Sequence, residues 1–430
     1  MENKVDRGLA QMIDWKLVIC YLLLLVIGLA NIYASIHSAD PEPFLAWSSR
    51  SGKQVVWALT SLVLATLILF AIKPKLWEVI SVPAYLTVLV LLIAVIFLGV
   101  EVKGSRSWFA FGPVRFQPAE ISKISTALLL STIMSRQNFR MSRLKDFLLA
   151  AFVIGVPMLV IVAESETGSA LVYVGFLFVL YREGLSGWIL YLVGMAIVLF
   201  ILSLATPLWV PFLVLVAAVL FFVLMHRSSI GRSLARRRSI IRLSLAGFAV
   251  GSALIFSTQF VFNNILQDHQ RKRIEVLLGL KEDPSGVGYN VTQSMIAIGS
   301  GGFAGKGYLR GTQTTYGFVP EQSTDFIFCT VGEEWGFLGC ALVILLYAYM
   351  IYRIIQDAEK SREAFTRIYG YCVASCIFMH LFINIGMTIG LMPVIGIPLP
   401  FLSYGGSSLW AFSILLFIFI ALNKQENKYF

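Results

Sequence analysis

The chain has 430 residues, of which 58% are hydrophobic and only 13% are charged, and its mean hydropathy is +0.80. So large an apolar fraction excludes a soluble globular protein and predicts an all-α, polytopic helical membrane protein. The net charge of +10 comes from basic residues placed between apolar runs, which indicates topology signals rather than nucleic-acid binding.

Twelve apolar runs are suited to cross a bilayer as helices, because a helix satisfies its own backbone hydrogen bonds in lipid. The first run has no cleavage site of small residues behind it, so we expect a retained helix and no cleaved signal peptide. The short run at 168–181 and the tight break at Thr206-Pro207 leave the count open by one pair. The runs lie at about 17–36, 54–72, 77–99, 119–135, 146–163, 168–181, 187–205, 206–225, 243–262, 326–352, 366–390 and 405–423.

Basic residues set the expected orientation. With both termini in the cytoplasm, clusters of Lys and Arg fall in the inner loops, whereas the short outer loops near Thr206 and at 391–404 carry none. The Arg-rich run at 227–242 fits this topogenic role, and a lipid or nucleic-acid patch is the alternative. The polar segments that then face outward are 100–118, 164–168, 263–325 and 393–408.

The cysteines point to neither a disulfide framework nor a metal site. All five lie inside or at the edge of apolar runs, where they are typical of small buried hydrophobes. Cys372 and Cys376 share one predicted helix and have no second ligand pair nearby.

The longest outer segment, 263–325, keeps about sixty residues outside the bilayer, and loops of that length are usually functional or disordered. Its richness in Gly and paired charges argues against a simple linker. The basic cluster Arg271, Lys272 and Arg273 precedes the acidic pair Glu282 and Asp283. Asp283 is followed by Pro-Ser-Gly, so it is either a turn-forming residue or a general base within reach of a hydroxyl proton.

The outer segment 100–118 combines cations with an aromatic ring. Lys103 and Arg106 flank a Gly-Ser turn that leads to Trp108. This arrangement offers phosphate donors beside an aromatic platform, or it is an interfacial Trp with snorkelling cations.

Ionisable residues also occur at the outer ends of apolar runs, where they are costly and usually paired or functional. Glu120 and Lys123 are spaced i,i+3 and therefore share one helix face, either as a functional pair or as a structural ion pair. Glu333 and Glu334 lie about two turns into the next helix, and we expect Arg or Lys from the outer loops as their partners.

The last helix begins at a Gly-rich segment that contains Ser403, Gly405 and Gly406. Free backbone N–H groups at such a start make an anion site, and close helix packing is the alternative role of the glycines. Together, the outer segments predict a cation-lined cavity that fits a lipid-phosphate enzyme or an anion transporter.

The ordered set of motifs resembles the SEDS family (shape, elongation, division and sporulation), and Gly311-Thr-Gln313 resembles its elongation branch. The matching strings cover most of the chain. They are Lys103-Gly-Ser-Arg-Ser-Trp108, Phe116-Gln-Pro-Ala-Glu-Ile-Ser-Lys123, Gln270-Arg-Lys-Arg-Ile274, Asp283-Pro-Ser-Gly-Val-Gly-Tyr289, Ala297-Ile-Gly-Ser-Gly-Gly302, Gly305-Lys-Gly307, Pro320-Glu321, Thr324-Asp-Phe-Ile-Phe328, Gly332-Glu-Glu334, Pro398-Leu-Pro400 and Ser403-Tyr-Gly-Gly406.

The resemblance implies an inverting glycosyltransferase that polymerises lipid II into peptidoglycan strands at the outer face of the membrane during cell elongation. A lipid II flippase or other transporter of lipid-linked oligosaccharides is the alternative, and a non-catalytic scaffold is a third. The family's essential loop Asp maps onto Asp283, the expected general base. Substrate-binding roles are expected for Lys103, Arg106, Trp108, Glu120, Lys123, Arg271, Arg273, Ser403, Gly405 and Gly406, with the cations near the diphosphate and Glu120 orienting Lys123.

The resemblance also implies the surroundings of the enzyme. We expect a multi-pass protein of the bacterial cytoplasmic membrane, with its active site outward, that works with a class B penicillin-binding transpeptidase and the elongation machinery. Its ligands would be lipid II and the glycan linked to undecaprenyl diphosphate, with no nucleic acid. A divalent cation, Mg²⁺ or Mn²⁺, could bridge the diphosphate, although no ligand cluster identifies it, and no organic cofactor is expected.

Two features depart from the family pattern. Glu164-Ser-Glu-Thr-Gly168 stands where Gln-Pro-Asp-x-Gly is usual, so Glu166 keeps a carboxylate but the Pro is lost. The family usually has about ten core helices, so we expect one integral membrane domain over 1–430 with an additional helical hairpin at 187–242. This hairpin, with its Arg-rich cytoplasmic loop, is expected to be peripheral to the catalytic cavity. The large outer segment 263–325 is expected to be the catalytic loop.

Overall fold

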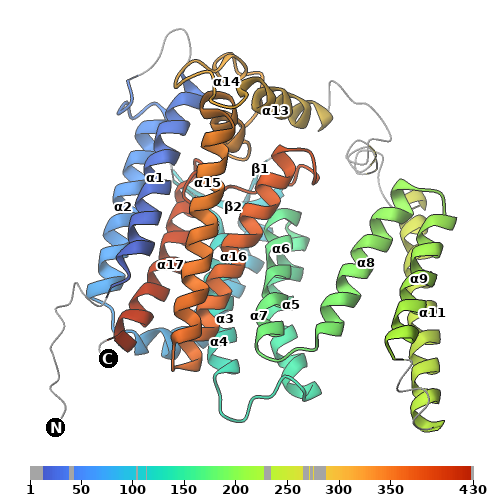
Figure 1. The fold of residues 1–430 in the computed structure, drawn as a ribbon. Helices are drawn as coiled ribbons and strands as arrows, with labels where there is room; N and C mark the ends of the chain where they lie inside the picture. Colours follow the sequence, from blue (N-terminus) through green and yellow to red (C-terminus); the bar gives the residue numbers. More distant parts are fainter. Residues whose placement is uncertain are drawn as a thin grey trace, which may run out of the picture. The chain divides into compact units, whose positions relative to one another are not determined.

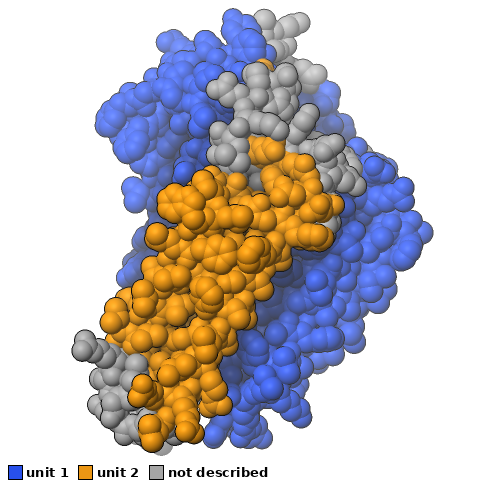
Figure 2. All heavy atoms as spheres, turned by 90° about the vertical axis from the view of Figure 1, so that its right-hand side faces the viewer, with its two compact units in different colours: residues 1–185, 290–430 blue, residues 186–289 orange. Residues whose placement is uncertain are grey.

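Helices make up nearly all the regular structure of the chain (Figure 1). The computed structural model describes residues 13–37, 43–102, 105–112, 114–226, 234–264, 271, 275 and 287–427. The chain forms two compact units (Figure 2), which are Met1–Leu185 with Asn290–Phe430 (unit 1) and Ser186–Tyr289 (unit 2).

The predicted polytopic helical membrane protein is confirmed. Within the described residues, nine helices are long and apolar enough to cross a membrane. Of the other three predicted runs, 119–135 and 206–225 form shorter helices, and 168–181 forms a helix in three short segments. In unit 1 the helices are α1 (Trp15–Ile36), α2 (Arg50–Phe70), α3 (Lys75–Leu98), α4 (Pro118–Met134), α5 (Leu144–Ala163), α6 (Thr167–Val172), η2 (Tyr173–Gly175), α7 (Phe176–Arg182), α14 (Thr312–Thr315), α15 (Ile327–Lys360), α16 (Ala364–Thr388) and α17 (Gly406–Asn427); α13 (Val287–Gly301) begins in unit 2 and ends in unit 1.

The outer segment 100–118 contains a small sheet that the hydropathy pattern did not predict. Its strands are β1 (Val100–Val102), β2 (Ser105–Phe111) and β3 (Val114–Phe116), paired antiparallel in that order. Trp108 lies opposite Val100, and Phe109 lies opposite Phe116. Successive side chains of a strand point to opposite faces, so β2 presents two different sets of residues.

Helices α16 and α17 form the centre of unit 1. In the apolar 18-residue stretches of α16 and α17, 78% and 72% of the residues are buried. In those of α2, α3 and α5 the share is 28%, so most of their surface is left for lipid. Helix α17 packs against α2, α4 and α16, and α16 packs against α4 and α15.

Helix α15 is broken at Gly336, where the backbone has φ +63° and ψ −158°. The break frees two carbonyls and two N–H groups that a continuous helix would pair. The Gly-rich segment 302–307 takes up all four: the amides of Lys306 and Gly307 donate to the carbonyls of Glu333 and Glu334, each at 3.0 Å. In return, the amides of Phe337 and Leu338 donate to the carbonyls of Gly302 and Phe303, at 2.9 and 3.2 Å. Unpaired backbone groups are costly in an apolar bundle, so these four hydrogen bonds fix the segment 302–307 onto α15.

Unit 2 contains α8 (Gly187–Ala205), α9 (Trp209–Met225) and α11 (Leu234–Asn264). The two helices of the predicted hairpin both pack against α11, around a core of Leu199, Leu215 and Ile255. The side chain of Gln259 also donates a hydrogen bond to the carbonyl of Ser203. The structure therefore groups the hairpin helices with the helix that leads into the large outer loop.

Helix α1 packs closely on the segment before α17, and Gly28 allows this approach. A Cβ atom at Gly28 would lie 2.7 Å from the carbonyl oxygen of Phe401 and 2.8 Å from the Cα of Leu402. Gly28→Ala should therefore lower the free energy of unfolding by about 1–3 kcal/mol, the usual cost of overpacking. Gly155→Ala is the matched control, because a Cβ there meets nothing within 4 Å and should stabilise α5 by up to about 1 kcal/mol. Thermal unfolding in detergent measures both, and equal shifts would contradict the packing argument.

Candidate functional site

Strand β2 presents a cation and an aromatic ring on one face. Arg106 is exposed and Trp108 is half-buried, two residues apart, while Ser105 and Ser107 are buried on the opposite face. The Nε of Arg106 lies 3.6 Å from Oε2 of Glu101, and the two side chains are 60% and 59% exposed. Exposed pairs of this kind are weak, so the guanidinium remains available to a ligand.

The buried face of β2 is anchored to the segment that departs from the family pattern. The hydroxyl of Ser107 donates to Oε1 of Glu166 at 2.6 Å, and that of Ser105 donates to the backbone carbonyl of Glu164 at 2.8 Å. Charge-assisted hydrogen bonds are among the stronger ones in proteins. Glu166 therefore holds in place the strand that carries Arg106.

Glu164 is a buried carboxyl group with no hydrogen-bond partner on either oxygen among the described residues. It is only 3% exposed and directly follows α5. Burial, with the charge of Glu166 as a smaller cause, raises the pKa of Glu164 to about 8. The carboxyl group therefore carries a proton at neutral pH.

Lys123 is the centre of a buried polar cluster. Its Nζ lies 2.9 Å from Oε2 of Glu120 and 2.9 Å from Nε2 of His380, and all three side chains are at most 2% exposed. Nδ1 of His380 lies 3.0 Å from the carbonyl oxygen of Pro398, which can only accept, so Nδ1 carries the proton and Nε2 accepts from Lys123. The ammonium group also lies 4.8 Å from the centre of the Phe412 ring.

This cluster joins α4, α16 and α17 with the loop before α17. The predicted pairing of Glu120 with Lys123 is confirmed. Because the ammonium group already faces a carboxylate, an imidazole and an aromatic ring, Lys123 is not open to a phosphate in this structure.

The turn that leads into α17 is held by hydrogen bonds of Ser403 and Gly405 and by close packing at Gly406. The Ser403 hydroxyl accepts from the amide of Leu399 at 2.8 Å and donates to the carbonyl of Thr324 at 2.6 Å. The amide of Gly405 donates to Oε1 of Gln54 at 3.1 Å. A Cβ at Gly406 would lie 2.8 Å from the indole of Trp57, which supports the close-packing alternative.

The buried carboxylate of Glu333 on α15 fixes the chain between Lys306 and Thr314. Its carboxylate accepts from Lys306 Nζ at 2.7 Å, from the amides of Thr312, Gln313 and Thr314 at 2.7–2.9 Å, and from the hydroxyls of both threonines. The expected cationic partner is thus confirmed for Glu333. For Glu334 no ion pair with an Arg or Lys occurs within the part of the chain that the structure describes, so its expected cationic partner stays a prediction.

The remaining predicted site residues are Lys103 from the segment 100–118, and Arg271, Arg273 and Asp283 from the segment 263–325. Lys103, Arg273 and Asp283 lie outside the described residues. In unit 2, the guanidinium of Arg271 donates to the carbonyls of Phe262 and Asn263 at 3.1 and 2.7 Å. These are among the last carbonyls of α11, so Arg271 satisfies a helix end.

Sequence reasoning missed His380, Ser107 and Gln54. For His380 a signal was present, because it is an ionisable residue within the apolar run at 366–390. Ser107 and Gln54 gave none, since their roles depend on partners 59 and 351 residues away.

Comparisons with known proteins agree on one family. A family model described as "Cell cycle protein", FTSW_RODA_SPOVE, matches residues 14–217 and 209–428. Peptidoglycan glycosyltransferase MrdB of Escherichia coli K12 is 33% identical over 389 residues, which cover 90% of this chain and 88% of the relative. Peptidoglycan glycosyltransferase RodA of Treponema pallidum is 30% identical over 438 residues, which cover 98% and 99%.

Two solved structures share the fold. A chain from the structure reported as "Structural coordination of polymerization and crosslinking by a peptidoglycan synthase complex" aligns with a TM-score of 0.69 and 24% identity, covering 96% of this chain and 98% of that chain. The rod shape determining protein RodA of Thermus thermophilus aligns with a TM-score of 0.59 and 22% identity, covering 96% and 97%.

The buried cluster yields a stability prediction. Lys123→Met leaves the Glu120 carboxylate buried without its cation, so we expect the free energy of unfolding to fall by about 3–5 kcal/mol. The double variant Glu120→Gln/Lys123→Met removes both charges and should recover most of that loss. Unfolding of the detergent-purified protein measures both variants. Equal destabilisation of the single and double variants would show that the charges are not coupled.

The protonated Glu164 yields a pH prediction. Its folded pKa is raised, so the folded state keeps a proton that the unfolded state releases between about pH 4.5 and 8. Stability from this group is therefore fully present below pH 4.5 and is lost as the pH rises to 8, by about 1.4 kcal/mol per unit. Glu164→Gln should flatten the dependence of melting temperature on pH between 5 and 8. An unchanged slope in this variant would refute the assignment.

Proposed function

Because the chain belongs to the FtsW/RodA/SpoVE family of cell cycle proteins and is a peptidoglycan glycosyltransferase, we propose that it polymerises lipid II at the outer face of the cytoplasmic membrane during elongation. The observation that carries this proposal is the placement of Arg106 and Trp108 on one face of β2, while Ser107 on the opposite face is bonded to Glu166. A guanidinium beside an indole suits a sugar linked to a diphosphate.

In the proposed reaction, the 4-hydroxyl of the acceptor GlcNAc attacks the anomeric carbon of the donor MurNAc. The new oxygen–carbon bond forms as the bond from that carbon to the diphosphate oxygen breaks, and undecaprenyl diphosphate leaves with the electron pair. Attack from the opposite side turns the α linkage into a β linkage. The hydroxyl proton passes to the carboxylate of Asp283 as general base.

The leaving diphosphate needs cations at the outer face. Among the described candidates, Arg106 is suited to this role because it is exposed and only weakly paired. We assign Lys123 a positioning role instead, since its ammonium group is buried and occupied by Glu120 and His380. Lys103 and Arg273 complete the proposed set of cations.

A divalent cation is not placed by the described residues. They contain no group of three His, Cys, Asp or Glu side chains that could hold a metal ion. Magnesium sites often use one or two carboxylates together with substrate phosphates, so Mg²⁺ or Mn²⁺ would depend chiefly on the diphosphate.

The proposed topology places both termini in the cytoplasm. Helix α1 begins and α17 ends at the same end of unit 1 (Figure 1). Residues predicted for the inner side pair with one another: Arg353 with Asp14 at 2.6 Å, Arg182 with Glu359 at 2.6 Å and Arg367 with Glu183 at 3.0 Å. This network supports a cytoplasmic assignment for that end.

We further propose a class B penicillin-binding transpeptidase as partner within the elongation machinery. The structural neighbour described as a peptidoglycan synthase complex that coordinates polymerisation and crosslinking supports this choice. Outward transport of lipid II is the alternative function. Transporters place their coupling residues near the bilayer midplane, whereas Arg106 and Trp108 lie on a strand, β2, in a segment that we propose to face outward.

Asp283→Asn tests the proposed base. With purified protein, its transpeptidase, lipid II and a divalent cation, we expect the glycan ladder of the variant to fall by about 10²–10⁴-fold, the contribution of a general base. Asp146→Asn is the matched control, because Asp146 lies at the predicted inner end of α5 and should leave polymerisation unchanged. Full polymerisation by Asp283→Asn would refute the base. Movement of lipid II across vesicle membranes without any polymer from the wild type would favour transport.

A further inference from the structure

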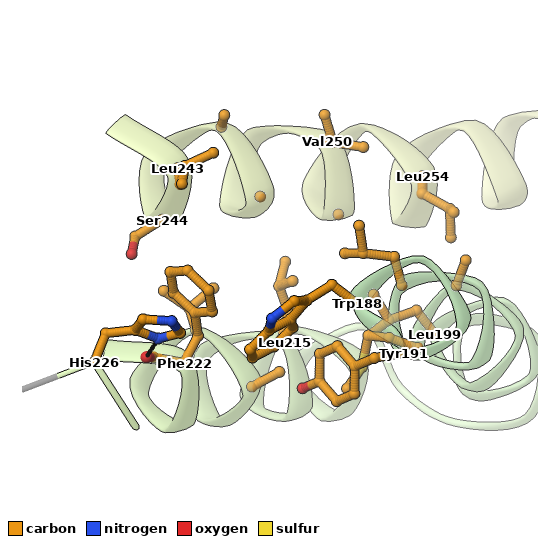
Figure 3. A pocket seen from close by; sticks show the side chains of 18 residues that line it. Trp188, Tyr191, Leu199, Leu215, Phe222, His226, Leu243, Ser244, Val250 and Leu254 are labelled. Atoms are coloured by element: carbon orange, nitrogen blue, oxygen red, sulfur yellow. Dashed lines mark hydrogen bonds between the residues drawn. The ribbon is translucent and has the colours of Figure 1, made fainter. Parts of the chain in front are cut away.

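Unit 2 has a half-open apolar cavity between α8, α9 and α11 (Figure 3). Its volume is about 600 Å³, within the range of roughly 300–1,000 Å³ that is typical of ligand sites. The walls are almost entirely hydrocarbon and aromatic, including Met195, Leu199, Leu215 and Leu254. Such a lining suits an aliphatic chain.

One end of the cavity is polar. His226 and Ser244 lie at this end, while Leu199 and Leu254 lie at the other (Figure 3). Nδ1 of His226 is 2.9 Å from the carbonyl of Phe222, which takes its proton and leaves Nε2 for another partner. The buried hydroxyl of Ser244 has no hydrogen-bond partner within the described ranges. These two groups can serve a polar head at the end of an apolar chain.

The same end carries an unbalanced positive charge. Between residues 184 and 267 the sequence has no Asp or Glu, yet six arginines fall between 227 and 242. Arg237, Arg238 and Arg242 are exposed on α11 and make no ion pair with any described residue. Arg237 lies seven residues before Ser244, which puts it on the same helix face about two turns away.

Helix α11 places the arginines at its first end and the start of the large outer loop at its other end. The helix runs 31 residues, or about 45 Å, from the arginines to the start of the large outer loop. A phosphate bound at the arginine end would therefore lie in the opposite leaflet from lipid II under the proposed topology. This makes the polyprenyl substrate an unsuitable occupant.

We propose that unit 2 binds an anionic diacyl phospholipid of the inner leaflet. One acyl chain fills the cavity between the three helices, and the phosphate lies among His226, Ser244 and Arg237. The hydrocarbon walls select a lipid chain, and the surplus of arginines selects an anionic head group over a zwitterionic one. Only the choice of leaflet rests on the proposed topology; the binding itself is independent of glycosyltransferase activity.

Glycines on these helices allow the cavity to be filled without a backbone clash. A Cβ at Gly247, which lines the cavity, meets no atom within 4 Å, whereas one at Gly251 would lie 2.4 Å from Leu215. Gly247→Leu should therefore occupy the space of the acyl chain. Gly194→Leu is the matched control, because Gly194 on α8 also meets nothing but does not line the cavity.

The test is native mass spectrometry of the full chain in detergent, titrated with phosphatidylglycerol, with phosphatidylcholine of the same acyl chains, and with undecaprenyl phosphate. We expect phosphatidylglycerol to bind at least about tenfold more tightly than phosphatidylcholine, and Arg237→Gln to weaken it about fivefold. Gly247→Leu should abolish this preference, while Gly194→Leu and Arg136→Gln, a change of an exposed arginine in unit 1, should leave it intact.

Three outcomes would overturn the proposal. They are equal binding of the two phospholipids, tighter binding of undecaprenyl phosphate, and unchanged binding in a folded Gly247→Leu variant. The melting temperature of each variant shows whether it is folded. Because the readout is lipid binding, a failure here is distinguishable from a failure of the polymerase proposal.

Discussion

The arrangement of the segment 302–314 on α15 depends on the need to pair every backbone group in an apolar bundle. The break in α15 at Gly336 leaves carbonyls and amides without helical partners, and the segment 302–307 supplies them. The Glu333 carboxylate then collects the amides of the next turn, at 312–314. A single discontinuity in one helix thus holds a Gly-rich segment that has little apolar surface of its own with which to fold.

Buried charged side chains also need hydrogen-bond partners in an apolar bundle. The ion pair of Glu120 and Lys123 completes its hydrogen bonding through His380, so its parts have one mutually satisfying arrangement. Buried pairs often add little net stability, and we regard this one as specifying how α4, α16 and α17 meet. The Glu164 carboxyl group, which has no hydrogen-bond partner among the described residues, instead stays neutral by keeping its proton.

Hydropathy and spacing predicted the apolar runs and the pairing of Glu120 with Lys123, because both depend on neighbours within one helix. They did not predict the sheet at 100–116, whose outer strands are only three residues long. Nor could they place His380 against Lys123, which is 257 residues away along the chain. The segment 164–168 lacks the Pro of the family pattern, yet its Glu166 carboxylate accepts a hydrogen bond from Ser107. No local sequence pattern predicts this contact.

The packing of α17 on α2 has a consequence for biosynthesis. The indole of Trp410 donates to the hydroxyl of Thr60 at 2.9 Å, across 350 residues of chain. At about 5–20 residues per second, the ribosome completes that interval in roughly 20–70 s. During this time α2 lacks its contacts with α17, although its Ser61 hydroxyl has a partner in Tyr21 of the earlier helix α1. The final packing of unit 1 is therefore completed only after its last helix has been synthesised.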